Sequence, residues 1–334
     1  MTSEAVAQSR GAAAVEALSR RHRLRLIELL PWLAAGGAFF LFPDYLPLGA
    51  QILINILFAL SLDLILGYAG IVTLGHAAFF GVGAYTAGLL AAHGWGEPIS
   101  GLVVAGLVAS IVGLASGAII LRTSGLTLLM LTLMIAVMLQ EAANKAGSVT
   151  GGADGLQGMK VWPVLGLFHF DLFGRTAYLY CVAVVFLGWL AARRLVHSPF
   201  GRTLTGIRES EARMHAIGSP VFRRRLTIYT IAAGMAGIAG ALLAQTTQFV
   251  GLEVLSFERS GTILIMLIIG GVGRLYGAFL GVPLFMIAQD RFAQIDPVYW
   301  DFWIGLLLLL VVIFARGGIL GLYEALTRRW ARRP

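Results

Sequence analysis

The chain has 334 residues, of which 58% are hydrophobic and 13% are charged, and its mean hydropathy is +0.83. A soluble domain carries about 25% charged residues, so this composition excludes a water-soluble globular fold. The net charge of +8 would suit a nucleic-acid-binding protein, but the placement of the charges, described below, argues against a nucleic-acid partner.

Long stretches without Asp, Glu, Lys or Arg follow one another along the chain. A helix needs about 20 mainly apolar residues to cross a bilayer, and shorter runs suffice where a helix is broken or re-entrant. We therefore predict an all-α, polytopic transmembrane bundle of about ten crossings with broken or re-entrant segments, surrounded by membrane lipid. The runs cover residues 29–43, 45–62, 64–96, 98–121, 123–140, 176–192, 226–252, 260–273, 275–289 and 302–315.

The basic residues predict the orientation of these crossings. If the N-terminus is cytoplasmic, the outer segments contain only Lys145, Lys160, Arg175, Arg259 and Arg291, and all other members of the 25 Lys and Arg residues fall on inner segments. Cytoplasmic loops of membrane proteins carry such an excess of Lys and Arg. Both termini are therefore expected to be cytoplasmic.

The chain divides into three parts by composition. Residues 1–26 form a mixed Ala, Arg and Glu leader without the apolar core of a secretory signal. Residues 27–320 form the transmembrane domain, which includes a cytoplasmic segment at 196–225, and residues 321–334 form a basic cytoplasmic tail. The single cysteine, Cys181, cannot form an intramolecular disulfide.

A glycine-rich stretch from Gly67 to Tyr85 lies within the longest uncharged run. Glycine weakens a helix by about 1 kcal/mol relative to alanine and lets backbones approach closely. We interpret the stretch as a broken or re-entrant helix that lines a translocation path; tight packing through small residues is the alternative. The candidate path residues are Gly67, Tyr68, Gly70, Gly75, His76, Phe79, Phe80, Gly81 and Gly83.

Few ionisable residues lie inside the predicted membrane region. Asp63 and His76 are the deepest, and Glu141 lies nearer an outer end. A proton relay needs a chain of such groups, which these do not form. We interpret His76 as a hydrogen-bonded residue at a helix end, and Asp63 as a cap or partner near Gly67.

The predicted outer loop, 144–175, contains a turn-rich sequence from Thr150 to Leu156. It either closes the loop, which the sequence favours slightly, or forms an outer gate or a contact for a substrate-delivery protein. The residues concerned are Thr150, Gly151, Gly152, Asp154 and Gly155.

The long inner segment is predicted to form one amphipathic helix. Ser198 and Pro199 are suited to the helix start, and Gly218 and Pro220 to its end. Leu204, Ile207, Met214 and Ile217 would share one face. Such a helix either rests on the membrane surface or docks into a protein partner, and the acidic residues of the segment favour docking.

Catalytic motifs are absent from the sequence. No Gly-x-x-x-x-Gly-Lys-Ser/Thr loop is present, so the chain cannot hydrolyse ATP by that route. No nucleophile elbow, zinc-protease motif or metal-ligand cluster is present either, which predicts a non-enzymatic chain without a metal or other cofactor of its own.

Four stretches resemble the permease subunits of branched-chain amino acid ATP-binding-cassette (ABC) importers, the LivM-like family. They are Leu74–Phe80 within the glycine-rich stretch, Thr150–Leu156, Ser198–Gly218, and Gly270–Gly277 with its Gly-Gly-Val-Gly-Arg sequence. They occur in the order found in that family and cover most of residues 48–320.

The resemblance implies a permease subunit of the bacterial inner membrane, working with a homologous second permease, two cytoplasmic ATPase subunits that bind ATP and Mg, and a periplasmic substrate-binding protein. It implies that Ser198–Gly218 is a coupling segment similar to the Glu-Ala-Ala…Gly loop of such importers, although the spacing here is one residue longer. The residues implied in coupling are Arg208, Glu209, Glu211, Ala212 and Gly218. Branched-chain amino acids are the expected substrates, with urea, short amides and other amino acids as alternatives.

Two other classes remain as alternatives. An ion-coupled secondary transporter would need coupling-ion ligands at the membrane midplane. A membrane enzyme or electron-transfer subunit would need a catalytic set or facing histidines, and the histidines here are scattered.

Overall fold

The computed structural model describes residues 30–164, 166, 168, 174–297, 299, 302–306, 309, 313, 318, 319 and 321. The predicted leader, half of the last apolar run and all of the predicted tail except Gly321 lie outside these residues. The described residues are helical and contain no named strand; two isolated β-bridges, Leu156 with Val250 and Val164 with Phe168, are present among them.

The helices follow the apolar runs. The α-helices are α2 (Leu30–Leu41), α3 (Leu46–Asp63), α4 (Ala77–Ala92), α5 (Pro98–Ile120), α6 (Gly125–Lys145), α7 (Gly147–Thr150), α8 (Arg175–His197), α9 (Pro199–Glu209), α10 (Glu211–Ala216), α11 (Val221–Thr247), α12 (Phe257–Gly270) and α13 (Gly277–Ile295). Short 3₁₀ turns are η2 (Pro43–Tyr45), η4 (Gly152–Asp154) and η5 (Leu252–Leu255), and η3 (Leu64–Tyr68) is a π-helical turn that continues α3.

Five described helical segments are long and apolar enough to cross a membrane. They are Pro43–Tyr68, Pro98–Ile120, Gly125–Lys145, Arg175–His197 and Val221–Thr247. Two shorter apolar helices, Leu30–Leu41 and Ala77–Ala92, match further runs of the sequence. A membrane helical bundle is therefore the fold that these segments define.

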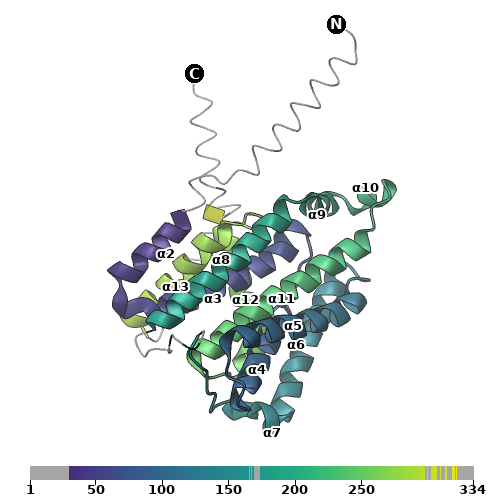
Figure 1. The fold of residues 1–334 in the computed structure, drawn as a ribbon. Coiled ribbons are helices and arrows are strands. Elements are labelled where there is room, and N and C mark those ends of the chain that lie inside the picture. The colour runs from purple at the N-terminus through teal and green to yellow at the C-terminus, as the bar shows by residue number, and fades with distance from the viewer. Residues whose placement is uncertain are drawn as a thin grey trace, which may run out of the picture. The chain divides into compact units, whose positions relative to one another are not determined.

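The chain forms two units, of which the first ends at Pro43 and contributes α2. The second begins at Asp44 and contains every helix from α3 onward. Figure 1 shows α9 and α10 at one end of the second unit, here named the α9 end, and α7 at the opposite end, named the α7 end.

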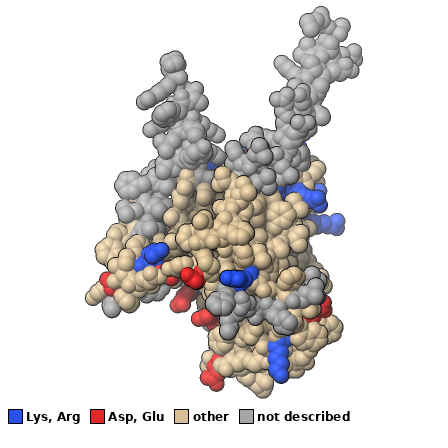
Figure 2. Space-filling model, turned by 60° about the vertical axis from the view of Figure 1, so that its left-hand side comes forward, with Lys and Arg blue, Asp and Glu red and all other residues tan. Residues whose placement is uncertain are grey.

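Helix α11 forms the centre of the second unit and packs most extensively on α5 and α4. Its middle is a run of buried small residues between Ala232 and Ala244, which lets neighbouring backbones approach closely. By contrast, most of α6 is exposed, and the face in Figure 2 is mainly uncharged, with its Lys, Arg, Asp and Glu side chains mostly in the lower half. Such an apolar exterior suits lipid as the surrounding solvent.

Candidate functional site

The glycine-rich stretch interrupts a membrane helix. Helix α3 continues through η3 to Tyr68, residues 69–76 are not helical, and α4 starts at Ala77. Gly70 has a φ of +69°, which L-residues with a side chain rarely adopt. The long uncharged run at 64–96 is therefore a broken helix, as its glycine content predicted.

A cluster of polar contacts, here named the Gly67 junction, holds the end of the interrupted helix. It consists of Asp63, Gly67, Arg208 and Gly273. The Arg208 guanidinium donates a hydrogen bond to the Gly67 carbonyl, and the Gly273 N–H donates to Asp63 Oδ1 at 2.7 Å. The Gly67 junction therefore joins α9 to the end of α3 and to the loop between α12 and α13.

Close packing requires glycine at this junction. A Cβ atom at Gly67 would lie 2.5 Å from the Gly273 nitrogen, and one at Gly70 would lie 2.8 Å from Arg208 Cγ. The Gly273 backbone cannot move aside as the end of a flexible side chain can, and at Gly70 the positive φ adds strain for any other residue. The neighbouring Tyr68 is half-buried and lies beside the Leu275 backbone of the same loop.

His76, Phe79 and Phe80 of the glycine-rich stretch are buried in the helix bundle. His76 lies just before α4, has no exposed surface, and its Nε2 atom is 2.8 Å from Ser61 Oγ. Its ring stacks on Phe58 with a centroid separation of 5.4 Å, and Phe79 meets it edge-on at 5.9 Å. These contacts fix the start of α4 against α3.

The other predicted path glycines, before and within α4, also contact neighbouring helical elements. Gly81 packs against Leu255 of η5, Gly83 against the Gly237 backbone of α11, and Gly75 against the Thr132 backbone of α6. Their role in lining a path stays a prediction, because the structure places them at helix contacts and none of them lines the cavity described below.

The turn at Thr150–Leu156 is held by its own hydrogen bonds. Thr150 Oγ1 donates to the Ala143 carbonyl at 2.6 Å and accepts from the Gly152 N–H at 3.3 Å. Leu156 forms both backbone hydrogen bonds of the bridge to Val250. The turn thus ties the end of α6 to the loop after α11. Positive φ angles occur at Gly151, Gly152 and Gly155, and Asp154 is exposed.

The inner segment forms two helices, so the prediction of one continuous helix is wrong. Ser198 caps α9 by accepting from the Gly201 N–H at 3.3 Å. The backbone is extended at Ser210, whose φ is −161° and ψ 100°, and its hydroxyl caps α10 by accepting from the Arg213 N–H at 3.3 Å. A serine can interrupt a helix in this way because its hydroxyl accepts a hydrogen bond from a backbone N–H, in place of a helical carbonyl.

The break also separates the four residues that were predicted to share a face. Leu204 and Ile207 are buried, whereas Met214 is half-buried and Ile217 is 74% exposed. Ile217 directly follows α10 and leaves a large apolar side chain uncovered at the α9 end.

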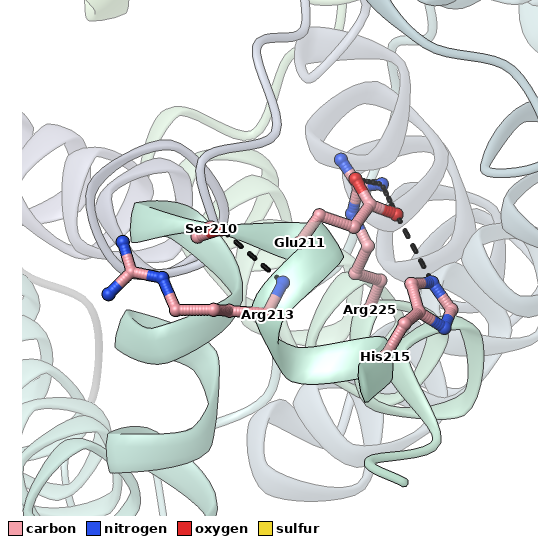
Figure 3. Close-up of polar contacts among 5 residues, drawn as sticks. All are labelled: Ser210, Glu211, Arg213, His215 and Arg225. Carbon is pink, nitrogen blue, oxygen red and sulfur yellow. Dashed lines mark hydrogen bonds and ion pairs between the residues drawn. The ribbon is translucent and has the colours of Figure 1, made fainter. Parts of the chain in front are cut away.

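Glu211 holds α10 against α11, as Figure 3 shows. Both of its carboxylate oxygens accept hydrogen bonds from Arg225 at 3.2 Å, and His215 Nε2 is 3.9 Å away. Of the other predicted coupling residues, Glu209 and Ala212 are exposed, and Gly218 has a φ of +78° with open space around it. Arg208 alone among the five is joined to the interrupted helix.

A cavity of about 600 Å³ opens among α3, α11, η5, α12 and α13. It lies toward the α7 end, because the loop that follows α11 pairs there with Leu156. Its lining combines apolar, polar and charged side chains. The polar and charged lining residues are Gln51, Asn55, Thr247, Glu253, Ser256, Glu258, Arg259, Thr262 and Gln289.

Sequence reasoning did not single out this cavity. A signal was available in the adjacent charges Glu258 and Arg259, which directly precede a short apolar run. The Arg259 guanidinium lies 4.9 Å from the centroid of the Phe80 ring. Phe80, a predicted path residue, therefore contacts a side chain of the cavity wall. Among the described residues, no group of His, Cys, Asp and Glu is arranged to hold a metal ion.

The described residues thus form a membrane helical bundle in which an interrupted helix is bonded to a capped polar segment at one end. Residues 47–312 match the family described as branched-chain amino acid transport system / permease component, and the chain belongs to this family. That family is a transport component and not a class of enzymes.

Named relatives agree with this assignment. The chain is 28% identical to the high-affinity branched-chain amino acid transport system permease protein LivM of Escherichia coli (strain K12), over 92% of this chain and 77% of the relative. It is 26% identical to a probable branched-chain amino acid transport permease protein LivM of Methanocaldococcus jannaschii, over 78% and 89%. It is 32% identical to the autoinducer 2 import system permease protein LsrC of an Enterobacter species (strain 638), over 44% of each chain. No solved structure matches the chain.

Proposed function

We propose that the chain is a permease subunit of an ABC importer that moves branched-chain amino acids across the bacterial inner membrane. It works with a homologous second permease, a substrate-binding protein outside the membrane and two cytoplasmic ATPase subunits, which bind ATP and Mg. The full chain crosses the membrane ten times with both termini in the cytoplasm. The names of the relatives that match over most of the chain support this substrate class and this kind of system.

The observation that carries the proposal is the bond between α9 and the interrupted helix. In a permease driven by separate ATPases, a movement at the cytoplasmic surface must reach the membrane interior. Arg208 provides such a connection, since it belongs to α9 and bonds the backbone of Gly67 at the end of α3 and η3. A rigid-body shift of α9 would therefore move the Gly67 junction with it.

The exposed part of the same segment is the proposed docking surface. Ile217 is 74% exposed, and Glu209, Ala212 and Arg213 are also exposed, so a surface with an apolar residue among charges of both signs faces away from the bundle. A short helix that inserts an apolar residue into a groove is a recurring mode of protein recognition. We assign the groove to the ATPase partner.

The test is a pair of substitutions at the cytoplasmic surface. Ile217→Asp should weaken co-purification of the ATPase subunits with the tagged chain, because the aspartate must be desolvated in the groove. Arg122→Asp, on another exposed inner loop, is the matched control and should leave co-purification unchanged. Full recovery of the ATPases with Ile217→Asp would contradict the docking surface.

A second measurement addresses transport itself. Proteoliposomes that contain the assembled system should accumulate L-leucine only when ATP is supplied on the ATPase side. Uptake driven by an ion gradient without ATPase subunits would instead favour the secondary transporter.

A further inference from the structure

The cavity near α12 has the chemical composition that a zwitterionic amino acid requires. It offers a guanidinium from Arg259, carboxylates from Glu253 and Glu258, and apolar walls that include Ile263 and Met266. Its volume of about 600 Å³ falls within the usual range for small-molecule sites, about 300–1,000 Å³. Neither an ion nor a purely apolar solute needs both signs of charge beside an apolar wall.

Arg259 is held in place but keeps its hydrogen-bonding groups available. Its guanidinium lies over the Phe80 ring, an arrangement that positions a cation. Within the part of the chain that the structure describes, its side chain donates no hydrogen bond and joins no ion pair. A guanidinium with free N–H groups matches a carboxylate, which it binds with two parallel hydrogen bonds.

The backbone around Arg259 adds to the attraction for a carboxylate. Arg259 occupies the first turn of α12, whose N-terminus carries partial positive charge. Ser256 caps that turn by accepting from the Arg259 N–H at 3.2 Å, so the start of the helix is fixed at the wall of the cavity. The helix terminus alone would not define a site, but here it reinforces a charged side chain inside a cavity.

The acidic residues are placed to receive the ammonium group. Glu253 interacts electrostatically with Arg259 without reaching ion-pair distance, and both Glu253 and Glu258 are exposed to the cavity region. A gap between opposite charges can be bridged by a molecule that carries both charges a few ångströms apart, as an α-amino acid does.

We propose that this cavity binds the transported amino acid directly, with its α-carboxylate on Arg259, its α-ammonium on the carboxylates of Glu253 and Glu258, and its aliphatic side chain against Ile263 and Met266. The inference rests on the proposed function and extends it, because it gives the permease a substrate site of its own. Solutes that lack either charge would be bound poorly.

The experiment uses a cysteine inside the cavity. Thr262 lines the cavity, and Thr262→Cys can be labelled without removing the native cysteine because Cys181 is fully buried. The purified complex of both permeases and the ATPases, without the binding protein, is treated with a membrane-impermeant maleimide. L-Leucine should slow the labelling at Thr262→Cys and should not change the labelling at Ala153→Cys in the outer loop.

Two solutes and two variants test the assigned contacts. Isoamylamine, which lacks the carboxylate, and 4-methylpentanoate, which lacks the ammonium, should fail to protect Thr262→Cys. Arg259→Gln should raise the L-leucine concentration needed for protection about tenfold or more, and Arg259→Lys should raise it less. Arg259→Lys also serves as the folded variant if the glutamine variant does not assemble.

The outcomes separate the site from the function. If L-leucine does not protect Thr262→Cys while the complete system still takes up L-leucine with ATP, the site is refuted and the proposed function stands. Equal protection by isoamylamine, or protection unchanged in both Arg259 variants, also refutes the site. If the complete system takes up no L-leucine with ATP, the proposed function fails instead.

Discussion

Replacement of Gly240 by alanine tests a close contact between helices α4 and α11. A Cβ atom at Gly240 would overlap the Phe80 carbonyl oxygen and lie 2.8 Å from the Phe80 carbonyl carbon and 2.9 Å from the Ala84 nitrogen. Ordinary van der Waals contact begins at 3.4 Å, and all three neighbours are backbone atoms of α4. Helices α4 and α11 must therefore separate by about 1 Å or more to accept one methyl group.

The expected loss of stability follows from this displacement. Overpacking of a well-packed interior costs about 1–3 kcal/mol, and here the separation also loosens the start of α4, where Phe80 supports Arg259. Since 1.4 kcal/mol corresponds to a tenfold change in an equilibrium constant, Gly240→Ala should lower the folded-to-unfolded ratio by roughly 5- to 140-fold. The measurement is equilibrium unfolding of the purified protein by SDS titration in mixed micelles.

Gly261→Ala is the matched control. Gly261 lies inside α12, and a Cβ atom there would have no neighbour within 4 Å. Alanine favours a helix over glycine by about 0.5–1 kcal/mol, so this variant should be as stable as the original chain or slightly more stable. If Gly240→Ala unfolds at the same SDS fraction as Gly261→Ala, the close approach of α4 to α11 is wrong.

Three other predictions concern the Gly67 junction and the topology. Arg208→Met should retain ATP hydrolysis in the assembled complex and lose most L-leucine uptake; normal uptake would show that the bond to Gly67 is dispensable. Asp63→Asn keeps an oxygen that accepts from Gly273 N–H and should assemble normally, whereas Asp63→Leu leaves that buried donor unpaired at a cost of about 1–3 kcal/mol and should lower the yield of folded protein; equal yields would contradict this. Cysteines at Ala216 and Ala153 should be labelled by impermeant reagents from the cytoplasmic and outer sides respectively, and reversed labelling would overturn the orientation.

The local features of the fold were accessible from the sequence. Uncharged runs of sufficient length predicted α3, α5, α6, α8 and α11, because the bilayer sets both the length and the composition of a crossing. The glycine content predicted the interruption before α4, since several glycines within one run weaken a helix.

The wrong prediction of one continuous helix in the inner segment also has a local cause, at Ser210. The periodicity of Leu204, Ile207, Met214 and Ile217 favoured one helix, yet Ser210 followed by Glu211 is itself a helix-start signal. The structure follows the second signal, and the side chain of Ser210 caps a new helix. In this segment the capping residue in the middle of the pattern therefore outweighs the hydrophobic repeat.

The candidate sites depend on contacts that no local pattern contains. Arg208 and Gly67 are separated by 141 residues, and Asp63 and Gly273 by 210. The cavity likewise combines residues of α3, α11, α12 and α13. Periodicity specifies which face of a helix is apolar, but it does not specify which other helix that face meets.

Two charged residues of the coupling segment bond it to two different membrane helices. Glu211 bonds Arg225 and so fixes α10 on α11, while Arg208 bonds Gly67 and so fixes α9 on the interrupted helix. A force applied at the exposed Ile217 would reach α11 through the Glu211–Arg225 bond and α3 through the bond from Arg208 to Gly67. Because α3 and α11 both line the cavity that contains Arg259, a displacement of either helix at the α9 end would alter the cavity near the α7 end. The two proposals thus predict that Arg208→Met, far from the cavity, leaves L-leucine protection of Thr262→Cys intact but makes it insensitive to ATP.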